Sequence, residues 1–290
     1  LLNNGKLKEG LDEIEWRWKT DIFSGQKRNF LQPLWDGKQS LNGKRILIWH
    51  EQGVGDTINW SSILPLVTNR AAHCILECQE KLVPLLKRSF PNVEVKPEDR
   101  SRDLKRDDFD YHLPMGSLYK HFLQEITDNP KPDAHLIPDP DRVNHWRGRL
   151  NLLGKGPYIG IAWKSSNMSV ERLPNYSCIS EWSQILSLPD VTFINLQSKD
   201  FADDLAKVRE ELGVTIHNFD DLDQWNNIDD VAALCRAIDV LISNHGTVPL
   251  ITGGVGTVTK LANWRQSSWN NILYNSIGSS VDIFERDTLE

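Results

Sequence analysis

Hydrophobic positions in the N-terminal half of the chain alternate between short apolar runs and stretches with helical spacing. The apolar runs predict strands at 45–50, 73–78, 92–96 and 109–113. The stretches between them predict helices at 57–70 and 80–89. Strands that alternate with helices are typical of a parallel sheet with helices on its faces. We therefore expect a Rossmann-like α/β domain over residues 44–138.

The second half of the chain repeats this alternation. Apolar runs predict strands at 157–163, 191–197, 214–217, 238–243 and 255–261. Helical spacing predicts helices at 140–153, 179–188, 201–212 and 229–237. A proline-rich stretch at 128–141 lies between the halves and suits a linker. The fold class that we expect is therefore α/β, with two Rossmann-like domains facing a cleft and the second domain at 139–290.

The first 43 residues differ from both halves. Their apolar positions share one helical face, which predicts a short helical segment within 1–19: Leu7, Leu11, Ile14 and Trp18. Residues 20–43 are polar and interrupted by glycine and proline, so we expect a connector. The charge-rich run at 96–108, KPEDRSRDLKRDD, predicts a solvated loop whose basic residues balance its acids.

Composition and charge narrow the class of protein. The 290 residues are 39% hydrophobic and 25% charged, which fits a globular protein of about two domains. The net charge of −7 disfavours nucleic acid or an anionic membrane as the main partner, since both select a basic surface. No apolar run approaches the roughly 18 residues of a membrane span, and no signal peptide is visible. The chain begins without Met, so we expect a fragment of a longer protein.

The four cysteines do not form a metal motif. Cys74, Cys78, Cys178 and Cys235 lack CxxC spacing, and the first two fall in phase on a predicted strand. We expect buried free thiols, which suit a reducing cytoplasm. No cluster of histidine and cysteine has metal-ligand spacing, so we expect no metal cofactor.

The most informative stretch is RILIWHEQGVGDTINW at 45–60. An apolar strand leads into a loop with Gly53 and Gly55 and then into a helix. Backbone N–H groups at such a helix start can bind an anion or a sugar phosphate. Asp56 and Thr57 are expected to cap this helix.

Two residues of this stretch are candidates for catalysis. Asp56 is the candidate general base, because a carboxylate can take the proton of an attacking acceptor hydroxyl. His50, at the end of the predicted strand, is a candidate to replace or tune that base.

Candidate donor-site residues follow the predicted strands of the second half, because ligands bind outside the carboxyl ends of parallel strands. Lys164 follows the strand at 157–163, where a lysine can neutralise a leaving diphosphate. Gln197 ends the next strand. The remaining candidates follow the strand at 238–243 and can bind a ribose, a sugar or, at a helix start, phosphate: Ser243, Asn244, His245, Gly246, Thr247 and Gly253.

Seven stretches, in this order, resemble one known group of proteins. They are LNNGKLKEGLDEIEWRW, WDGKQSLNGKRILIWHEQGVGDTINWSSILPLV, YHLPMGSLYKHF, GIAWKSS, FINLQSK, IDDVAALCRAIDVLISNHGTVPLITGGVGTV and NWRQSSWNNILY. The chain resembles the glycosyltransferase domain that follows tetratricopeptide repeats in many bacterial proteins, a domain related to the ADP-heptose–lipopolysaccharide heptosyltransferase family. The first stretch is similar to the end of a tetratricopeptide array.

The resemblance implies the GT-B arrangement and an inverting transfer from a nucleotide-sugar donor that requires no metal. It implies a glycan, a lipid-linked glycan or a protein as the acceptor, and a tetratricopeptide array at the N-terminus of the full-length protein. Asp56 falls at the family's catalytic aspartate, and Lys164 lies where the family has a basic residue.

Two other interpretations remain open. The family's donor block usually carries an Asp and, five residues later, a His, where this chain has His245 and Leu250. A GT-B-like binding or scaffold module without the chemistry is therefore the main alternative. A nicotinamide-dependent enzyme is a weaker one, because Gly53 and Gly55 do not complete the G-x-G-x-x-G pattern.

Overall fold

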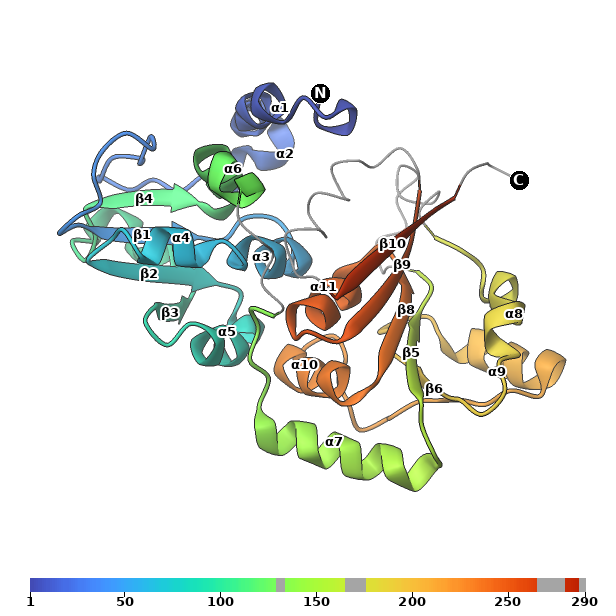
Figure 1. Cartoon of the computed structure of the whole chain (residues 1–290). Helices are drawn as coiled ribbons and strands as arrows, with labels where there is room; N and C mark the ends of the chain where they lie inside the picture. The colour runs from blue at the N-terminus through green and yellow to red at the C-terminus, as the bar shows by residue number, and fades with distance from the viewer. Residues whose placement is uncertain (129–133, 165–175, 265–279, 287–290) are drawn as a thin grey trace. The chain divides into compact units, whose positions relative to one another are not determined.

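The computed structural model describes residues 1–128, 134–164, 176–264 and 280–286. These residues form two compact units, with unit 1 up to residue 128 and unit 2 from residue 134 onward. Each unit is built around its own parallel sheet (Figure 1). The expected fold class, α/β with two Rossmann-like domains, is confirmed.

Unit 1 contains a parallel four-stranded sheet in the order β3-β2-β1-β4. Its strands are β1 (Arg45–Trp49), β2 (His73–Cys78), β3 (Glu94–Pro97) and β4 (Tyr111–Pro114). Its helices after β1 are α3 (Val54–Ser61), α4 (Leu64–Thr68), α5 (Val83–Ser89) and α6 (Leu118–Asp128). Three 3-10 turns follow β1 in the unit: η3 (Glu80–Leu82), η4 (Arg100–Lys105) and η5 (Met115–Ser117). Three successive residues of β1, Ile46, Leu47 and Ile48, are fully buried, as is typical of a parallel strand covered on both faces.

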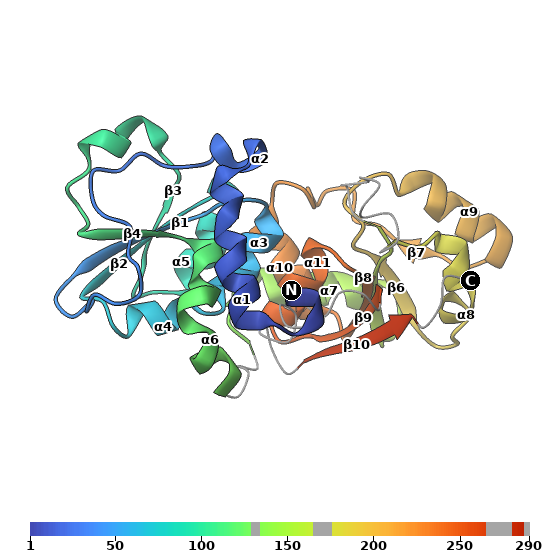
Figure 2. The same cartoon turned by 90° about the horizontal axis from the view of Figure 1, so that it is seen from above.

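The N-terminal segment is part of unit 1. It contains η1 (Leu2–Asn4), α1 (Leu7–Glu13), η2 (Ile14–Lys19) and α2 (Asp21–Ser24). Helix α1 lies beside α6 (Figures 1 and 2). The connector that follows then reaches β4, where Leu34 forms a parallel bridge with His112 and Trp35 donates its backbone N–H to the His112 carbonyl at 2.9 Å.

Unit 2 contains a parallel six-stranded sheet in the order β10-β9-β8-β5-β6-β7. Its strands are β5 (Tyr158–Ala162), β6 (Thr192–Asn195), β7 (Ile216–His217), β8 (Val240–Asn244), β9 (Val258–Trp264) and β10 (Val281–Arg286). Its helices are α7 (Pro140–Leu153), α8 (Ser183–Leu186), α9 (Ala202–Leu212), α10 (Ile228–Ala237) and α11 (Thr247–Gly254), with a 3-10 turn, η7 (Ile179–Trp182), before α8. Among the residues that these bounds cover, no helix is long and apolar enough to cross a membrane.

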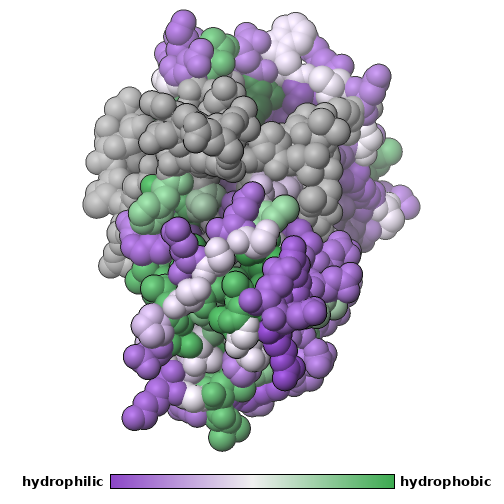
Figure 3. All heavy atoms as spheres, turned by 90° about the vertical axis from the view of Figure 1, so that its right-hand side faces the viewer, coloured by the Kyte–Doolittle hydropathy of each residue, from purple (hydrophilic) through white to green (hydrophobic). Residues whose placement is uncertain are grey.

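Two helices of unit 2 are joined by a partly buried polar contact. The Asp230 carboxylate of α10 accepts hydrogen bonds from Arg142 Nε at 2.8 Å and from Trp146 Nε1 at 2.7 Å, both on α7. Hydrophilic and apolar residues both reach the surface in Figure 3, and Leu188 and Leu212 are among the exposed apolar side chains of this unit. Scattered exposed leucines are normal on protein surfaces.

The helices and strands differ from expectation at several places, among them the helices α2 and α6, which were not expected. The helix expected at 57–70 is two helices, because Pro65 lacks an N–H group and instead falls in the first turn of a new helix, α4. Strand β10 was not expected, since the stretch before it gives no periodic signal. The expected burial of the Cys74 and Cys78 thiols is confirmed, and burial raises the pKa of each to about 12.

Candidate active site

Each sheet has one position at which the strand order reverses, and ligands of open parallel sheets bind outside the carboxyl ends of the strands there. In unit 1 this position lies between β1 and β4, and in unit 2 it lies between β5 and β8. The candidates His50 and Asp56 follow β1, and Lys164 follows β5. Ser243 and Asn244 end β8, and the candidates at 245–247 follow it. The chain order therefore brings most candidates to one of two sheet edges, one in each unit.

Glu51 anchors the chain directly after β1. Its side chain is fully buried, and its two carboxylate oxygens accept hydrogen bonds from Arg17 Nε and Nη2, each at 2.7 Å. Glu51 Oε1 also accepts a hydrogen bond from the backbone N–H of Gly116, in the turn after β4, at 2.9 Å. A Cβ atom at Gly116 would clash with this carboxylate. One buried carboxylate thus joins both strand ends to the N-terminal segment.

Arg17 makes further contacts that hold it in place. It donates hydrogen bonds to Ser117 Oγ at 2.9 Å and to Glu15 Oε1 at 2.9 Å. Burial disfavours its charge, but the hydrogen bonds and charges of Glu51 and Glu15 outweigh burial and raise the pKa of the Arg17 guanidinium. The Arg17 guanidinium is therefore charged at neutral pH and held by partners on both sides.

The helix after the glycine loop begins earlier than expected. Gly53, and not Asp56 or Thr57, is the N-cap of α3, but Asp56 still contributes to capping the helix through its side chain, as part of a capping box. Asp56 is the third helical residue, and its Oδ2 accepts a hydrogen bond from the Gly53 backbone N–H at 2.9 Å. A carboxylate at the third position can reach back to the cap residue in this way, and the helix dipole favours its charge there. Gly55 lies within the first turn, beside the half-buried Asp56.

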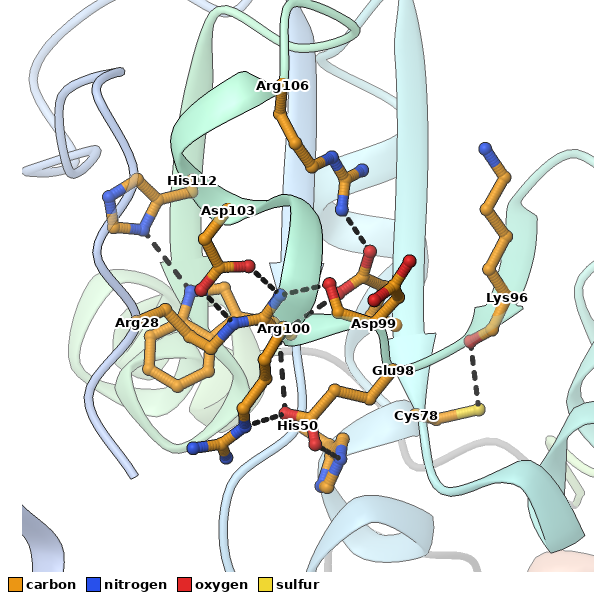
Figure 4. Close-up of polar contacts among 12 residues, drawn as sticks. Arg28, His50, Cys78, Lys96, Glu98, Asp99, Arg100, Asp103, Arg106 and His112 are labelled. Carbon is orange, nitrogen blue, oxygen red and sulfur yellow. Dashed lines mark hydrogen bonds and ion pairs between the residues drawn. The ribbon is translucent and has the colours of Figure 1, made fainter. Parts of the chain in front are cut away.

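His50 lies close to charged residues of the 96–108 run (Figure 4). Its Nε2 is 3.5 Å from Glu98 Oε2. Glu98 also accepts hydrogen bonds from Arg100 Nε at 3.0 Å and from Arg28 Nη1 at 3.3 Å. Burial alone would raise the pKa of Glu98, but the hydrogen bond to His50 and the positive neighbours lower it to about 2.

The expectation of a solvated loop at 96–108 holds for most of the run, which is exposed, but it is wrong at Asp103 and Arg106, which are buried. Arg28 of the connector is buried and binds Asp103 of that run, with Nε 2.7 Å from Oδ2, and Glu77 of β2 at 3.0 Å. Arg106 is also buried and pairs with Glu77 and, through two hydrogen bonds of 2.8 Å, with Asp108. Asp103 and Arg106 are thus buried against Arg28 and Glu77, which lie far away in the sequence, so a local pattern could not reveal their burial.

One histidine beside this network is held neutral. Trp49 donates its indole N–H to His112 Nδ1 at 3.2 Å, so Nδ1 must be unprotonated. Burial, together with the nearby Arg28 charge, lowers the pKa of His112 to about 4.

Lys164 and Gln197 meet at the carboxyl edge of the unit 2 sheet. The Lys164 backbone N–H donates to Gln197 Oε1 at 3.1 Å, and Lys164 Nζ is 2.8 Å from Asp204 Oδ2. Trp163 Nε1 donates to the same carboxylate oxygen at 2.8 Å. Both side chains of the ion pair are partly exposed, 22% for Lys164 and 28% for Asp204. The Lys164 ammonium is therefore oriented by Asp204 but still reached by solvent.

The end of β8 lies next to the end of β5, since Ala162 pairs with Ser243. Ser243 Oγ donates to the Asn244 carbonyl at 2.7 Å, and Asn244 Oδ1 accepts from Ser177 Oγ at 2.7 Å. Both of these β8 side chains are buried. Their hydrogen bonds therefore fix the backbone at the end of β8, and the side chains themselves are not exposed to a ligand.

Helix α11 begins at Thr247 with Gly246 as its N-cap, directly after His245. Pro249 falls in the first turn, where its missing N–H breaks no helical hydrogen bond. Gly253 lies in the last turn, at the opposite end from Thr247, and is buried.

In the part of the chain that the structure describes, no group of three or more His, Cys, Asp or Glu side chains could hold a metal ion.

The two Rossmann-like units have the architecture of known sugar transferases. A solved glycosyl transferase family 9 structure from Veillonella parvula matches with a TM-score of 0.63 and 12% identity, over 87% of this chain and 90% of that chain. ADP-heptose LPS heptosyltransferase II of E. coli matches with a TM-score of 0.58 and 12% identity, over 83% and 90%. E. coli heptosyltransferase WaaC, solved with ADP-2-deoxy-2-fluoro heptose, matches with a TM-score of 0.53 and 10% identity, over 83% and 92%. At these identities the likeness establishes the fold.

A curated relative is much closer in sequence. The chain is 34% identical over 271 residues to protein FlbA of Caulobacter vibrioides. The match covers 89% of this chain and 45% of that protein, so the chain spans less than half the length of this relative. No protein-family model matches the chain.

Sequence reasoning missed Glu51, Arg17, Arg28 and Glu98. Glu51 stands beside the glycine loop, and a carboxylate that follows an apolar strand is a signal for a buried ion pair. The partner could not be inferred, because Arg17 lies in the N-terminal segment and looked like one charge of a solvated helix face.

We expect Arg17→Ala to lower the free energy of unfolding of unit 1 by about 3–5 kcal/mol, because it leaves the Glu51 carboxylate buried without its cation. Urea denaturation followed by tryptophan fluorescence measures this loss. Arg45→Ala is the matched control, since Arg45 pairs with Asp110 at 3.3 Å on the surface. Its loss should stay below about 1 kcal/mol. Similar small losses for both variants would contradict a closed Arg17–Glu51 pair.

We expect unit 1 to lose stability as the pH falls from about 6.5 to 4. The folded pKa of His112, about 4, lies below its ordinary value of 6.5, so the unfolded chain binds more protons in this range. The full difference corresponds to about 3 kcal/mol at about 1.4 kcal/mol per pKa unit. Glu98, with a folded pKa of about 2, stays charged in the folded protein throughout this window, and its own stabilising contribution is lost mainly as the pH falls below its ordinary value of 4.5.

His112→Asn keeps a hydrogen-bond acceptor for Trp49 but does not titrate. We expect it to remove most of this pH dependence when urea unfolding is compared at pH 7 and pH 4.5. His73→Asn, at an exposed histidine of β2, is the control and should keep it. An unchanged slope in His112→Asn would show that other groups cause the acid sensitivity.

Proposed function

We propose that this chain is a glycosyltransferase domain that moves a sugar from a nucleotide-sugar donor to an acceptor hydroxyl. The observation that carries the proposal is the carboxyl edge of unit 2, where Lys164 and the start of α11 follow neighbouring strands at the position of strand reversal. A cationic side chain next to the N–H groups of a helix start suits a diphosphate. The likeness to transferases solved with ADP and an ADP-sugar supports the same donor class.

In this proposal the donor diphosphate lies between Lys164 and the first turn of α11. The Lys164–Asp204 pair is partly exposed, so it is weak enough for a diphosphate to share or replace Asp204 as the partner of the ammonium group. The lysine and the helix dipole then stabilise the negative charge that grows on the leaving diphosphate. This arrangement requires no metal, as the family resemblance also implies.

Asp56 is proposed as the general base of an inverting transfer. It takes the proton of the acceptor hydroxyl while the hydroxyl oxygen attacks the anomeric carbon and the nucleoside diphosphate departs. Its place in the first turn of α3 puts the carboxylate at the positive end of the helix dipole. His50, held by Glu98, lies one residue before Glu51 and is proposed to tune the field at this edge rather than to carry the proton.

The acceptor is proposed to be a glycan, a lipid-linked glycan or a protein, and the full-length protein to carry a tetratricopeptide array before this domain. The stretch that resembles the end of such an array, residues 1–19, is packed on unit 1 through Arg17. The greater length of FlbA is consistent with a domain that belongs to a larger protein.

We expect one nucleotide among ADP, UDP, GDP and CMP to stabilise the protein in thermal unfolding. At 100 times its dissociation constant a ligand adds about 2.7 kcal/mol. Lys164→Met should weaken that nucleotide at least tenfold, because the diphosphate loses its cation. Lys207→Met, on the solvent side of α9, is the control and should leave affinity within twofold. The lack of any shift with all four nucleotides and their sugar conjugates would instead favour a binding module without a donor.

Asp56→Asn separates the two roles of this side chain. The amide oxygen can still accept the Gly53 N–H, so α3 should keep its start and the nucleotide shift should be unchanged. Transfer should fall by about 10²–10⁴-fold, because an amide cannot take the proton. The initial rate of sugar transfer, measured with the donor that the thermal assay identifies, tests this. Full activity in Asp56→Asn would assign Asp56 to helix capping alone.

A further inference from the structure

Unit 1 contains a cavity of about 480 Å³ at the carboxyl end of its sheet. Trp49 and Pro114, the last residues of β1 and β4, line it and are register partners. The cavity therefore lies at the position of strand reversal, where open parallel sheets bind ligands. Its size falls within the roughly 300–1,000 Å³ of ordinary ligand pockets.

The floor of the cavity is aromatic. Trp18 lies against Trp49, with ring centroids 5.5 Å apart, and Phe30 lies against His112 at 4.8 Å. Trp18 and Phe30 come from the N-terminal segment and the connector, while Trp49 and His112 come from the sheet. The cavity is thus formed by the connector lying over the exposed end of the sheet.

The polar atoms of the floor are already engaged. The Trp49 indole N–H is donated to His112 Nδ1, and the guanidinium of Arg28 is bound by Glu77, Asp103 and Glu98. A sugar ring pressed into this floor would give up hydrogen bonds to water without replacing them, at a cost of about 1–3 kcal/mol for each group. The floor therefore selects an apolar group.

The rim of the cavity is amphipathic. Leu34 and Leu104 are 51% and 62% exposed, and Lys27 and Asn29 stand between them as exposed polar residues. Pockets that receive an anchoring side chain are fully desolvated and well packed at their centre, as the buried Trp49 of the aromatic floor is here. Lys27 and Asn29 can donate hydrogen bonds to the backbone carbonyls of a segment that crosses the rim.

We propose that this cavity binds an apolar side chain of a polypeptide acceptor. The inference rests on the proposed transferase function and selects a protein from the three acceptor classes. A glycan is disfavoured because the polar atoms of the floor already have hydrogen-bond partners and leave none for sugar hydroxyls. A lipid-linked acceptor must be taken from an anionic membrane surface by a chain of net charge −7, whose electrostatics oppose that approach.

The test uses N-acetyl-L-leucinamide and N-acetyl-L-phenylalaninamide as probes, and follows the indole N–H signals of Trp18 and Trp49 by two-dimensional NMR. We expect saturable shifts with these amides. Leu104→Glu should weaken the binding at least fivefold, because it places a charge at the apolar rim. Leu152→Glu is the matched control in unit 2, where the leucine is 87% exposed, and it should change the binding by less than twofold.

Methyl glycosides and farnesyl phosphate form the other arms of the test. Saturation by methyl glycosides alone would assign the cavity to a glycan, and tighter binding of farnesyl phosphate than of the amides would assign it to a lipid. Absence of saturable shifts with every probe would overturn the site itself. Amide binding needs no donor and the nucleotide shift needs no acceptor, so failure of this inference is distinct from failure of the proposed transferase function.

Discussion

The buried ion pair between Arg17 and Glu51 is the constraint on which the candidate edge of unit 1 depends. Glu51 lies between β1 and the glycine loop, so its position sets where the loop leaves the sheet. A buried carboxylate without a partner would cost several kcal/mol, and the chain meets this cost with a guanidinium from the N-terminal segment. The segment before β1 is therefore a structural part of the edge that carries Asp56, and the same carboxylate fixes the turn after β4 through Gly116.

The two units treat charge in opposite ways, and the difference follows their proposed roles. In unit 1 the arginines Arg17, Arg28 and Arg106 are closed within carboxylate partners, which makes the support of the loop rigid. In unit 2 Lys164 forms an ion pair with Asp204, and this pair remains partly exposed to solvent. Exposed pairs contribute about 0–1 kcal/mol, so a ligand with two or more negative charges can compete for the lysine. A general base requires a rigid support, which the buried ion pairs of unit 1 provide. A phosphate requires a cation whose partner can be exchanged, which the partly exposed Lys164–Asp204 pair of unit 2 provides.

Periodicity predicted most of the fold because the strands of parallel sheets are continuous apolar runs, as in 45–50 and 238–243, and these are local signals. It also predicted which edge each candidate would reach, since Lys164 and the residues after β8 follow such runs directly. It failed where the deciding contact is remote. Asp103 and Arg106 look solvated until Arg28 and Glu77 are placed beside them, and α3 begins at Val54, with Gly53 instead of Asp56 at its N-cap and Asp56 reaching back to the Gly53 N–H.

The aromatic cavity, like the buried charges of the 96–108 run, arises from contacts between residues that are far apart in the sequence. Between α2 and β1 the connector contains no helix, and it covers the sheet with single side chains such as Phe30 instead of a continuous helical surface. A helix packed on a sheet fills the layer next to it, whereas an irregular segment fills only the points that its side chains reach. The remaining space falls at the carboxyl end of β1 and β4, because there the sheet order reverses and no crossover passes above it. The connector has no helical or strand-like spacing of apolar residues, so it leaves a concave, apolar surface on the sheet. In our proposal this surface selects the class of acceptor.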